Sequence, residues 1–210
     1  MDFCLFSLIS PYYSPKPSQN NPGKLTVVVR MAQLNDIKGL AEVLIQSFHS
    51  PQQWFSWLQP VFKLGIYEDF RHRFKAPSPY YCCLVATVPL EVSSDTQESI
   101  IGTVEINLRP EFNSKSLYIS NLAVSHGSRR RGVARHLLLK CEQIAREWGY
   151  QSLILHVLED NHSAKNLYLN SGYQLQSRQI TWQSWLFKSP QRLLLQKKID
   201  SSDSTKKNVK

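Results

Sequence analysis

The stretch SHGSRRRGVARHLLLK, residues 125–140, places three consecutive arginines and a glycine directly before an apolar pattern with helical spacing. From Val133 the apolar positions on one helical face are Ala134, Leu137, Leu138, Cys141, Ile144, Ala145 and Trp148, and Gly149 supplies a stop. A helix N-terminus presents unpaired N–H groups and a partial positive charge, and Gly132 has no Cβ to keep an anion away from the backbone. The stretch therefore predicts a phosphate site at the start of a helix.

Two common phosphate motifs do not fit this turn. Gly127 and Gly132 have the spacing of a P-loop, but Val133 and Ala134 stand where that motif needs Lys and Ser or Thr. No Gly-x-Gly-x-x-Gly follows a predicted strand, which excludes a Rossmann dinucleotide site. A solvated basic loop is the remaining alternative, and the position between a strand and an amphipathic helix favours phosphate binding over it.

Upstream of the turn, residues 25–30 read as a strand and residues 35–48 as an amphipathic helix with Asn35 or Asp36 as its cap. The next stretch, residues 52–75, is rich in aromatic side chains. Pro60 and Gly65 are expected to break it into one or two helices. Its aromatic side chains are candidates for the core or for the wall of an acceptor channel: Trp54, Phe55, Trp57, Phe62, Tyr67 and Phe70.

Three β-rich runs lead into the turn, over residues 80–90, 99–109 and 116–124, and the polar segment 91–98 between the first two is typical of a hairpin. Downstream, the sequence predicts a strand over residues 152–158. A short helix ended by Gly172 and strand-like sequence to about Gln196 follow. This order of elements predicts an α/β fold with a mixed, mostly antiparallel sheet flanked by helices.

The composition is that of a folded protein with a basic character. The 210 residues are 42% hydrophobic with a formal charge of +9, so nucleic acid, anionic membranes and anionic small ligands are all possible partners. We expect a flexible lead-in over residues 1–24, one domain over 25–197, and a disordered Lys/Ser-rich tail over 198–210. Part of the positive charge lies in that tail.

The cysteines bear on the compartment. Cys4, Cys82, Cys83 and Cys141 have neither a metal-binding nor a disulfide-like spacing, which indicates a reducing compartment and no metal. No apolar run approaches the about 18 residues of a membrane span, and the N-terminus is a poor secretory signal. We expect a cytoplasmic protein, with the plastid stroma as the alternative.

Two motifs resemble the GNAT superfamily of N-acetyltransferases. Arg129, Gly132 and Ala134 match the family's acetyl-CoA motif, and NHSAKNLYLNSGY, residues 161–173, matches its second motif. The resemblance covers residues 25–197 and implies a GNAT-like domain with a splayed central strand pair for acetyl-CoA. It further implies that backbone groups of Leu122, Ala123 and Val124 bind the pantetheine arm. The pyrophosphate would lie against Arg129, Arg130, Arg131, Gly132, Val133, Ala134 and Arg135.

The resemblance also implies catalytic roles in the second motif. Tyr168 occupies the position of the general acid that protonates the CoA thiolate, and a phenol can serve this purpose when held against the sulfur. Asn161 is expected to bond the CoA chain with Ser163 beside it, a role compatible with that of a helix N-cap.

Two residues are candidates for the base that deprotonates the acceptor amine. His156 replaces the glutamate often found five positions before the motif Asn, and imidazole is a competent base near neutral pH. A buried structural histidine is the alternative. Glu105 could point its carboxylate into the acceptor cleft, and its alternative is a solvent-facing strand residue.

The predicted activity is acetyl transfer from acetyl-CoA to an amine in a ternary complex, with the backbone N–H near Leu122 stabilising the oxyanion and without a metal. The resemblance to the protein-acetylating branch, similar to ribosomal-protein N-terminal acetyltransferases, favours a protein α-amine or a lysine. A polyamine or antibiotic acetyltransferase and a non-catalytic acetyl-CoA sensor are alternatives. A nucleic-acid-binding module is disfavoured because residues 116–124 lack a basic-aromatic RNA signature.

Overall fold

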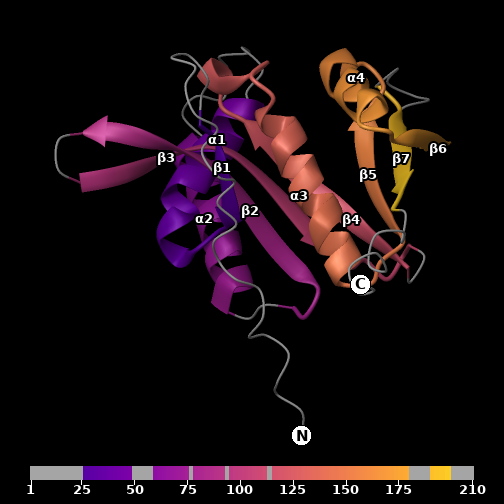
Figure 1. The fold of residues 1–210 in the computed structure, drawn as a ribbon, viewed down its shortest axis with the longest axis horizontal. Coiled ribbons are helices and arrows are strands. Elements are labelled where there is room, and N and C mark those ends of the chain that lie inside the picture. Colours follow the sequence, from indigo (N-terminus) through magenta and orange to yellow (C-terminus); the bar gives the residue numbers. More distant parts are fainter. Residues whose placement is uncertain are drawn as a thin grey trace, which may run out of the picture. The chain divides into compact units, whose positions relative to one another are not determined.

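The computed structural model describes residues 26–48, 59–75, 78–92, 95–112, 115–179 and 190–199. The expected lead-in (residues 1–24) and all of the expected tail after Ile199 lie outside them. Figure 1 shows the elements in chain order: β1 (Val28–Met31), the 3-10 turn η1 (Leu34–Asp36), α1 (Ile37–Phe48), α2 (Gln59–Lys75), β2 (Tyr81–Val92), β3 (Asp95–Asn107), β4 (Ser116–Val124), the 3-10 turn η3 (His126–Ser128), α3 (Val133–Glu147), β5 (Ser152–Leu158), α4 (His162–Asn170), β6 (Gln174–Gln179) and β7 (Arg192–Lys198).

The strands form one mixed sheet in the order β1-β2-β3-β4-β5-β7-β6. β1 runs antiparallel to β2, and β7 runs antiparallel to both β5 and β6, whereas β4 and β5 are parallel. A parallel pair needs a crossover connection, and α3 provides it between β4 and β5. The predicted α/β class with a mostly antiparallel sheet is confirmed.

The ladder between β4 and β5 is short. It joins Ser116–Tyr118 to Ser152–Ile154, and the described pairing of the two strands goes no further. β5 in contrast pairs with β7 over all seven of its residues. Asn121 has φ 51, which interrupts regular strand geometry in the second half of β4. The half of β4 beyond its described ladder with β5 is where the resemblance expects acetyl-CoA.

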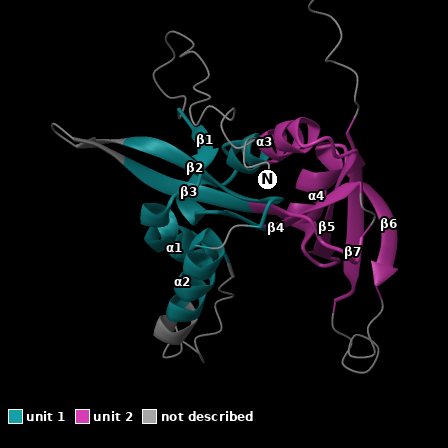
Figure 2. Ribbon diagram, turned by 90° about the horizontal axis from the view of Figure 1, so that it is seen from below, with its two compact units in different colours: residues 1–104, 121–137 teal, residues 105–120, 138–210 magenta. Residues whose placement is uncertain are grey.

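Two compact units divide the chain, one made of residues 1–104 and 121–137 and the other of residues 105–120 and 138–210 (Figure 2). In the first unit the apolar face of α1 is buried as its spacing predicts. The core cluster consists of Ile37, Leu40, Val43, Leu44, Phe70, Cys83, Val85 and Ala123. This unit packs α1 and α2 against strand residues.

α2 is the single helix among the alternatives predicted for residues 52–75, and neither Pro60 nor Gly65 breaks it between Gln59 and Lys75. Pro60 lies in the first turn, where its missing N–H has no helical partner to lose. Gly65 lies inside the helix at an exposed position, where a glycine costs about 1 kcal/mol relative to alanine and does not end the helix. The helical preference of the surrounding residues outweighs the unfavourable contribution of this glycine.

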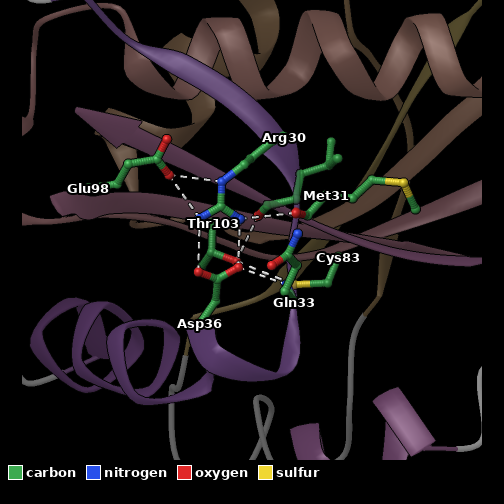
Figure 3. A network of polar contacts seen from close by, with 8 residues as sticks. Arg30, Met31, Gln33, Asp36, Cys83, Glu98 and Thr103 are labelled. Atoms are coloured by element: carbon green, nitrogen blue, oxygen red, sulfur yellow. Dashed lines mark hydrogen bonds and ion pairs between the residues drawn. The ribbon is translucent and has the colours of Figure 1, made fainter. Parts of the chain in front are cut away.

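A polar network ties β1, η1 and β3 of the first unit together (Figure 3). Arg30 donates to both carboxylate oxygens of Asp36, at 2.7 and 3.0 Å, and to Glu98 at 2.9 Å. Asp36 also accepts the backbone N–H of Gln33 at 2.7 Å, so Gln33 is the N-cap of this turn and Asp36 its N3 residue, in place of the expected cap at Asn35 or Asp36. Burial opposes ionisation of Asp36, but the bonds from Arg30 and Gln33 outweigh it and lower the pKa.

The second unit buries most of β5 and alternate residues of β7. The buried side chains on one face of these strands are Leu153, Leu155, Val157, Leu193 and Leu195. Glu142 of α3 is also buried and pairs with Lys197 of β7 at 2.6 Å. Side chains alternate along a strand, so His156 and Ile154 lie on the opposite face of β5. None of the described helices has the length and apolar character needed to cross a membrane.

Candidate functional site

The basic turn in the first unit is held in a defined conformation. Arg129 Nε donates to the carbonyl of Val124 at 3.1 Å, and the N–H of Ser125 donates to the carbonyl of Ile101 at 2.9 Å. Arg130 and Gly132 have φ values of 60 and 82. Left-handed residues in a turn direct successive backbone N–H groups toward one side, which is the geometry of an anion-binding nest. This defined, hydrogen-bonded conformation favours a binding role over that of a solvated basic loop.

The same turn carries uncompensated positive charge. Arg129, Arg130, Arg131 and Arg135 are exposed, and none of the ion pairs found among the described residues involves them. A Cβ built on Gly132 would meet no atom within 4 Å, so the space beside its backbone is open. With the N-terminus of α3 directly behind it, this turn can bind a phosphate-bearing ligand.

The predicted pantetheine-binding residues form the end of β4. Ala123 is buried with 5% exposure, while Leu122 and Val124 are half-buried. The carbonyl oxygen of Val124 accepts hydrogen bonds from the Arg129 side chain and, at 3.5 Å, from the Ser47 hydroxyl. The left-handed Asn121 precedes Leu122 and alters the direction of the backbone at this point. Val133 and Ala134, also predicted to bind the ligand, are buried and half-buried in the first turn of α3.

The second motif forms α4, as predicted. Asn161 caps the helix, because its Oδ1 accepts the backbone N–H of Ala164 at 3.1 Å. Asn161 and Ser163 are exposed, so both side chains are open to a ligand at the helix start. The expected N-cap role of Asn161 is confirmed.

Tyr168 lies in the last turns of α4 and is 8% exposed. Burial, and to a smaller extent Cys141 and Tyr118, raise the pKa of its phenol to about 12. Its ring meets that of Tyr173 edge to face, with 5.8 Å between the centroids. The phenol therefore keeps its proton over the whole physiological pH range, as a proton donor must before it reacts.

His156 of β5 forms a pair with Tyr118 of β4. The Tyr118 hydroxyl lies 3.0 Å from His156 Nδ1, and Phe112 stacks on the Tyr118 ring at a centroid distance of 5.5 Å. The guanidinium of Arg109 sits 4.0 Å from the centroid of the Tyr118 ring. The sequence did not identify Tyr118, Phe112 or Arg109 as site residues, because only the register of β4 with β5 brings Tyr118 level with Ile154 and beside His156.

The surroundings of His156 favour the neutral form of its imidazole. Burial lowers the pKa of the ring, and the charges of Arg192 and Arg109 lower it further, against a smaller opposing effect of Gln179. Nε2 is buried, and no described residue meets it with full hydrogen-bond geometry. Nδ1, in contrast, has a described hydrogen-bond partner, the Tyr118 hydroxyl.

Glu105 on β3 corrects an expectation. Its side chain has no exposed surface, so the alternative of a solvent-facing strand residue is wrong. Polar Thr103, two residues earlier, is also fully buried and donates to the carbonyl of Leu84 at 3.1 Å. β3 therefore carries two buried polar side chains, whose burial the alternation of residues along the strand does not predict.

The aromatic stretch divides between buried and exposed positions. Phe70 is 1% exposed and belongs to the core, whereas Tyr67 is 39% exposed. Trp54, Phe55 and Trp57 lie outside the described residues, as does the side chain of Phe62. Within the described parts of the chain, no group of three or more His, Cys, Asp or Glu side chains could hold a metal ion.

Comparisons with known proteins bear on this geometry. Two curated relatives from Arabidopsis thaliana are similar to the chain. "GCN5-related N-acetyltransferase 10, chloroplastic" is 29% identical over 175 residues, and "GCN5-related N-acetyltransferase 7, chloroplastic" is 30% identical over 142 residues. These alignments cover 79% and 54% of this chain, but only 68% and 52% of the relatives' own lengths.

Solved structures share the fold at low sequence identity. The ribosomal-protein-S18-alanine N-acetyltransferase from Escherichia coli has a TM-score of 0.59 at 12% identity, covering 85% of this chain and 97% of its own. The PaiA N-acetyltransferase from Thermoplasma acidophilum, solved with coenzyme A, has a TM-score of 0.59 at 17% identity, covering 83% and 99%. The family model "Acetyltransferase (GNAT) family" matches residues 43–173, which include both the basic turn and α4. The chain belongs to the GNAT family of acetyltransferases.

Proposed function

We propose that this protein transfers an acetyl group from acetyl-CoA to the amine of a protein or peptide, with an N-terminal α-amine as the preferred acceptor. The observation that carries the acceptor assignment is the Tyr118–His156 pair, in which the hydroxyl lies 3.0 Å from Nδ1 of an imidazole with a lowered pKa. A protonated amine must lose a proton before it can attack a thioester, and this pair can take it.

In the proposed reaction the amine proton passes to the Tyr118 oxygen while the Tyr118 proton moves to His156 Nδ1. The neutral amine nitrogen then attacks the thioester carbonyl carbon, and a C–N bond forms. The oxyanion is stabilised by the backbone N–H near Leu122. When the C–S bond breaks, the Tyr168 phenol donates its proton to the thiolate. The acylated nitrogen then loses its second proton, and that proton restores the Tyr168 phenol, so that the amide and the free CoA thiol are the products. Glu105, fully buried, is the alternative base.

The lowered pKa of His156 favours an α-amine over a lysine. An α-ammonium has a pKa of about 8 and a lysine ammonium a pKa of about 10.4, so a weakly basic imidazole deprotonates the former with less free energy. The exposed arginines Arg129, Arg130, Arg131 and Arg135 would bind the phosphates of acetyl-CoA together with Gly132 and the N-terminus of α3. Asn161 and Ser163 would contact the CoA chain.

We also propose the plastid stroma as the compartment, in place of the cytoplasm expected from the unpaired cysteines. Two relatives are named as chloroplastic, and the stroma is equally compatible with reduced thiols. A fluorescent fusion of the full chain should coincide with chlorophyll autofluorescence. A diffuse cytosolic signal would contradict this assignment.

The activity is tested by incubating the purified full chain with acetyl-CoA and three acceptor sets, and reading mass shifts. One set holds peptides with free α-amines and no lysine, another holds N-terminally blocked peptides with lysine, and the third holds polyamines. We expect transfer mainly to the first set, and Tyr118→Phe should reduce kcat at unchanged acetyl-CoA affinity. Tyr80→Phe is the control, because it removes the same hydroxyl from a 40% exposed tyrosine.

Each other outcome has a definite meaning. Transfer to polyamines alone would overturn the protein acceptor. Saturable acetyl-CoA binding without transfer to any set would overturn the catalytic function and leave a sensor of acetyl-CoA.

A further inference from the structure

Two arginines converge on the Tyr118–His156 pair from different elements of the second unit. Arg109, which follows β3, lies over the Tyr118 ring at 4.0 Å. Arg192 begins β7, where Leu194 stands opposite His156. Residues two apart in an antiparallel ladder share a face, so Arg192 is a diagonal neighbour of His156, at a typical Cβ separation of about 7–8 Å.

These charges are only partly neutralised. Arg109 pairs with Glu111 at 3.5 Å, and the two side chains are 39% and 55% exposed. Arg178 on β6 pairs with Glu159 at 3.4 Å, so those two charges offset each other. No ion pair is found for Arg192 among the described residues, and its side chain is exposed. The surroundings of the pair therefore have an excess of positive charge.

An acceptor whose reacting amine approaches Tyr118 must bring its neighbouring groups close to these arginines. A cationic neighbour on the acceptor would be repelled, while a carboxylate would be attracted. Exposed charges interact weakly one by one, so the selectivity they give should be modest and sensitive to salt.

We propose that Arg109 and Arg192 make the enzyme selective for acidic acceptors, peptides with Asp or Glu directly after the residue that carries the reacting α-amine. This inference rests on the proposed function. It makes the two arginines specificity-determining residues, and it disfavours polyamines and lysine-rich or arginine-rich N-termini as substrates.

The test uses three peptides that share one N-terminal residue, lack lysine and differ only at positions two and three. Those positions hold Asp-Glu, Asn-Gln or Arg-Arg. For the full-length protein we expect kcat/KM for the acidic peptide to exceed that for the basic peptide about tenfold, a difference that shrinks in high salt. The double variant Arg109→Gln/Arg192→Gln should bring the ratio to less than about twofold.

Two control variants separate charge from structure. Arg192→Lys keeps the charge and should keep most of the preference. Arg146→Gln removes one charge from an exposed arginine of α3, and its partner Glu142 retains Lys197, so the preference should stay as in the wild type. The salt dependence of the unmodified protein tests the idea even if a variant fails to fold.

The inference is overturned if the basic peptide is used as well as the acidic one, or if the double variant keeps the wild-type ratio. Absence of transfer to all three peptides would instead count against the proposed function itself.

Discussion

At the scale of single residues, parallel substitutions of Tyr168 and Tyr173 can distinguish a catalytic role from a packing role. Both are buried in the second unit, and their rings are in contact. If Tyr168 protonates the leaving thiolate, Tyr168→Phe should lower kcat about 100-fold, the usual contribution of a general acid, while acetyl-CoA affinity stays the same. Single-turnover kinetics and calorimetric titration measure the two quantities.

Tyr173→Phe is the control for this prediction. The Tyr173 hydroxyl is buried without a hydrogen-bond partner among the described residues, so its removal should leave kcat unchanged and the free energy of unfolding equal or slightly higher. Equal losses of activity in both variants would assign Tyr168 a packing role.

His156 gives a prediction in pH. Its pKa is lowered from 6.5, and a base works only in its unprotonated form, so kcat should be flat through neutral pH and fall only as the pH drops below 6.5. Arg192 is one cause of the lowered pKa, so Arg192→Gln should move this acid limb to higher pH. His72→Gln, in α2, should leave the limb in place. An acid limb that is unaffected by Arg192→Gln would exclude His156 as the titrating base.

Motif spacing located Tyr168 and Asn161 because both lie within one short segment of sequence. The partners of His156 could not be found in this way. Tyr118 is 38 positions from His156, and only the β4–β5 register joins them. Strand alternation gives the face on which a side chain lies, but it does not give the residue on the neighbouring strand.

At the scale of elements, the turn into α3 depends on Gly132. Its φ of 82 disfavours any other residue, and the open space beside it is where a phosphate would approach. Gly132→Ala should weaken acetyl-CoA binding about tenfold, through backbone strain and a methyl group in the ligand's path. Gly149→Ala, at φ 76 and equally open, imposes the same strain at the other end of α3 and should leave the dissociation constant unchanged. Equal effects of both changes in calorimetric titration would mean that the turn does not contact the ligand.

The packing of β3 against α3 in the first unit depends on Gly102. A Cβ there would lie 3.1 Å from the Ala123 carbonyl oxygen and from Val133 Cγ1, closer than normal contact. Gly102→Ala should therefore lower the free energy of unfolding by about 1–3 kcal/mol. Gly65→Ala, in the open middle of α2, should raise it by about 0.5–1 kcal/mol. Urea denaturation measures both, and an unchanged midpoint for Gly102→Ala would refute the tight packing.

Helix periodicity predicted α1, α3 and α4 well because each has an apolar face at a 3.6-residue repeat. α2 was harder to predict, because it contains Pro60 and Gly65, and whether such residues end a helix depends on their positions within its turns. The polar segment 91–98 was predicted as a turn, but β2 and β3 continue through most of it. Hydrogen bonding between neighbouring strands can extend a hairpin into residues with poor strand propensity.

At the scale of the whole molecule, the order of elements predicted the mixed sheet, since a strand-helix-strand crossover beside an antiparallel run permits few arrangements. The position of β7 between β5 and β6 was not predicted. Strands that follow one another in sequence are neighbours in most sheets, and β5 instead pairs with the more distant β7 over its full length. This long-range ladder is what aligns Arg192 diagonally with His156.

The net charge of the molecule leads to the last prediction. Residues 200–210 contain three lysines and two aspartates, so deleting them lowers the formal charge only from +9 to +8. The excess charge therefore lies mostly in the rest of the chain, although residues 196–210 as a whole, with five lysines and two aspartates, carry part of it as expected. If the exposed arginines at the start of α3 bind the phosphates of acetyl-CoA, affinity should fall as salt rises, and the truncated chain should show the same salt dependence as the full chain. Arg129→Gln/Arg131→Gln should flatten that dependence, as measured by titration calorimetry over a series of salt concentrations. A truncation that flattens it instead would place the phosphate contacts in the tail and contradict the assignment of the turn.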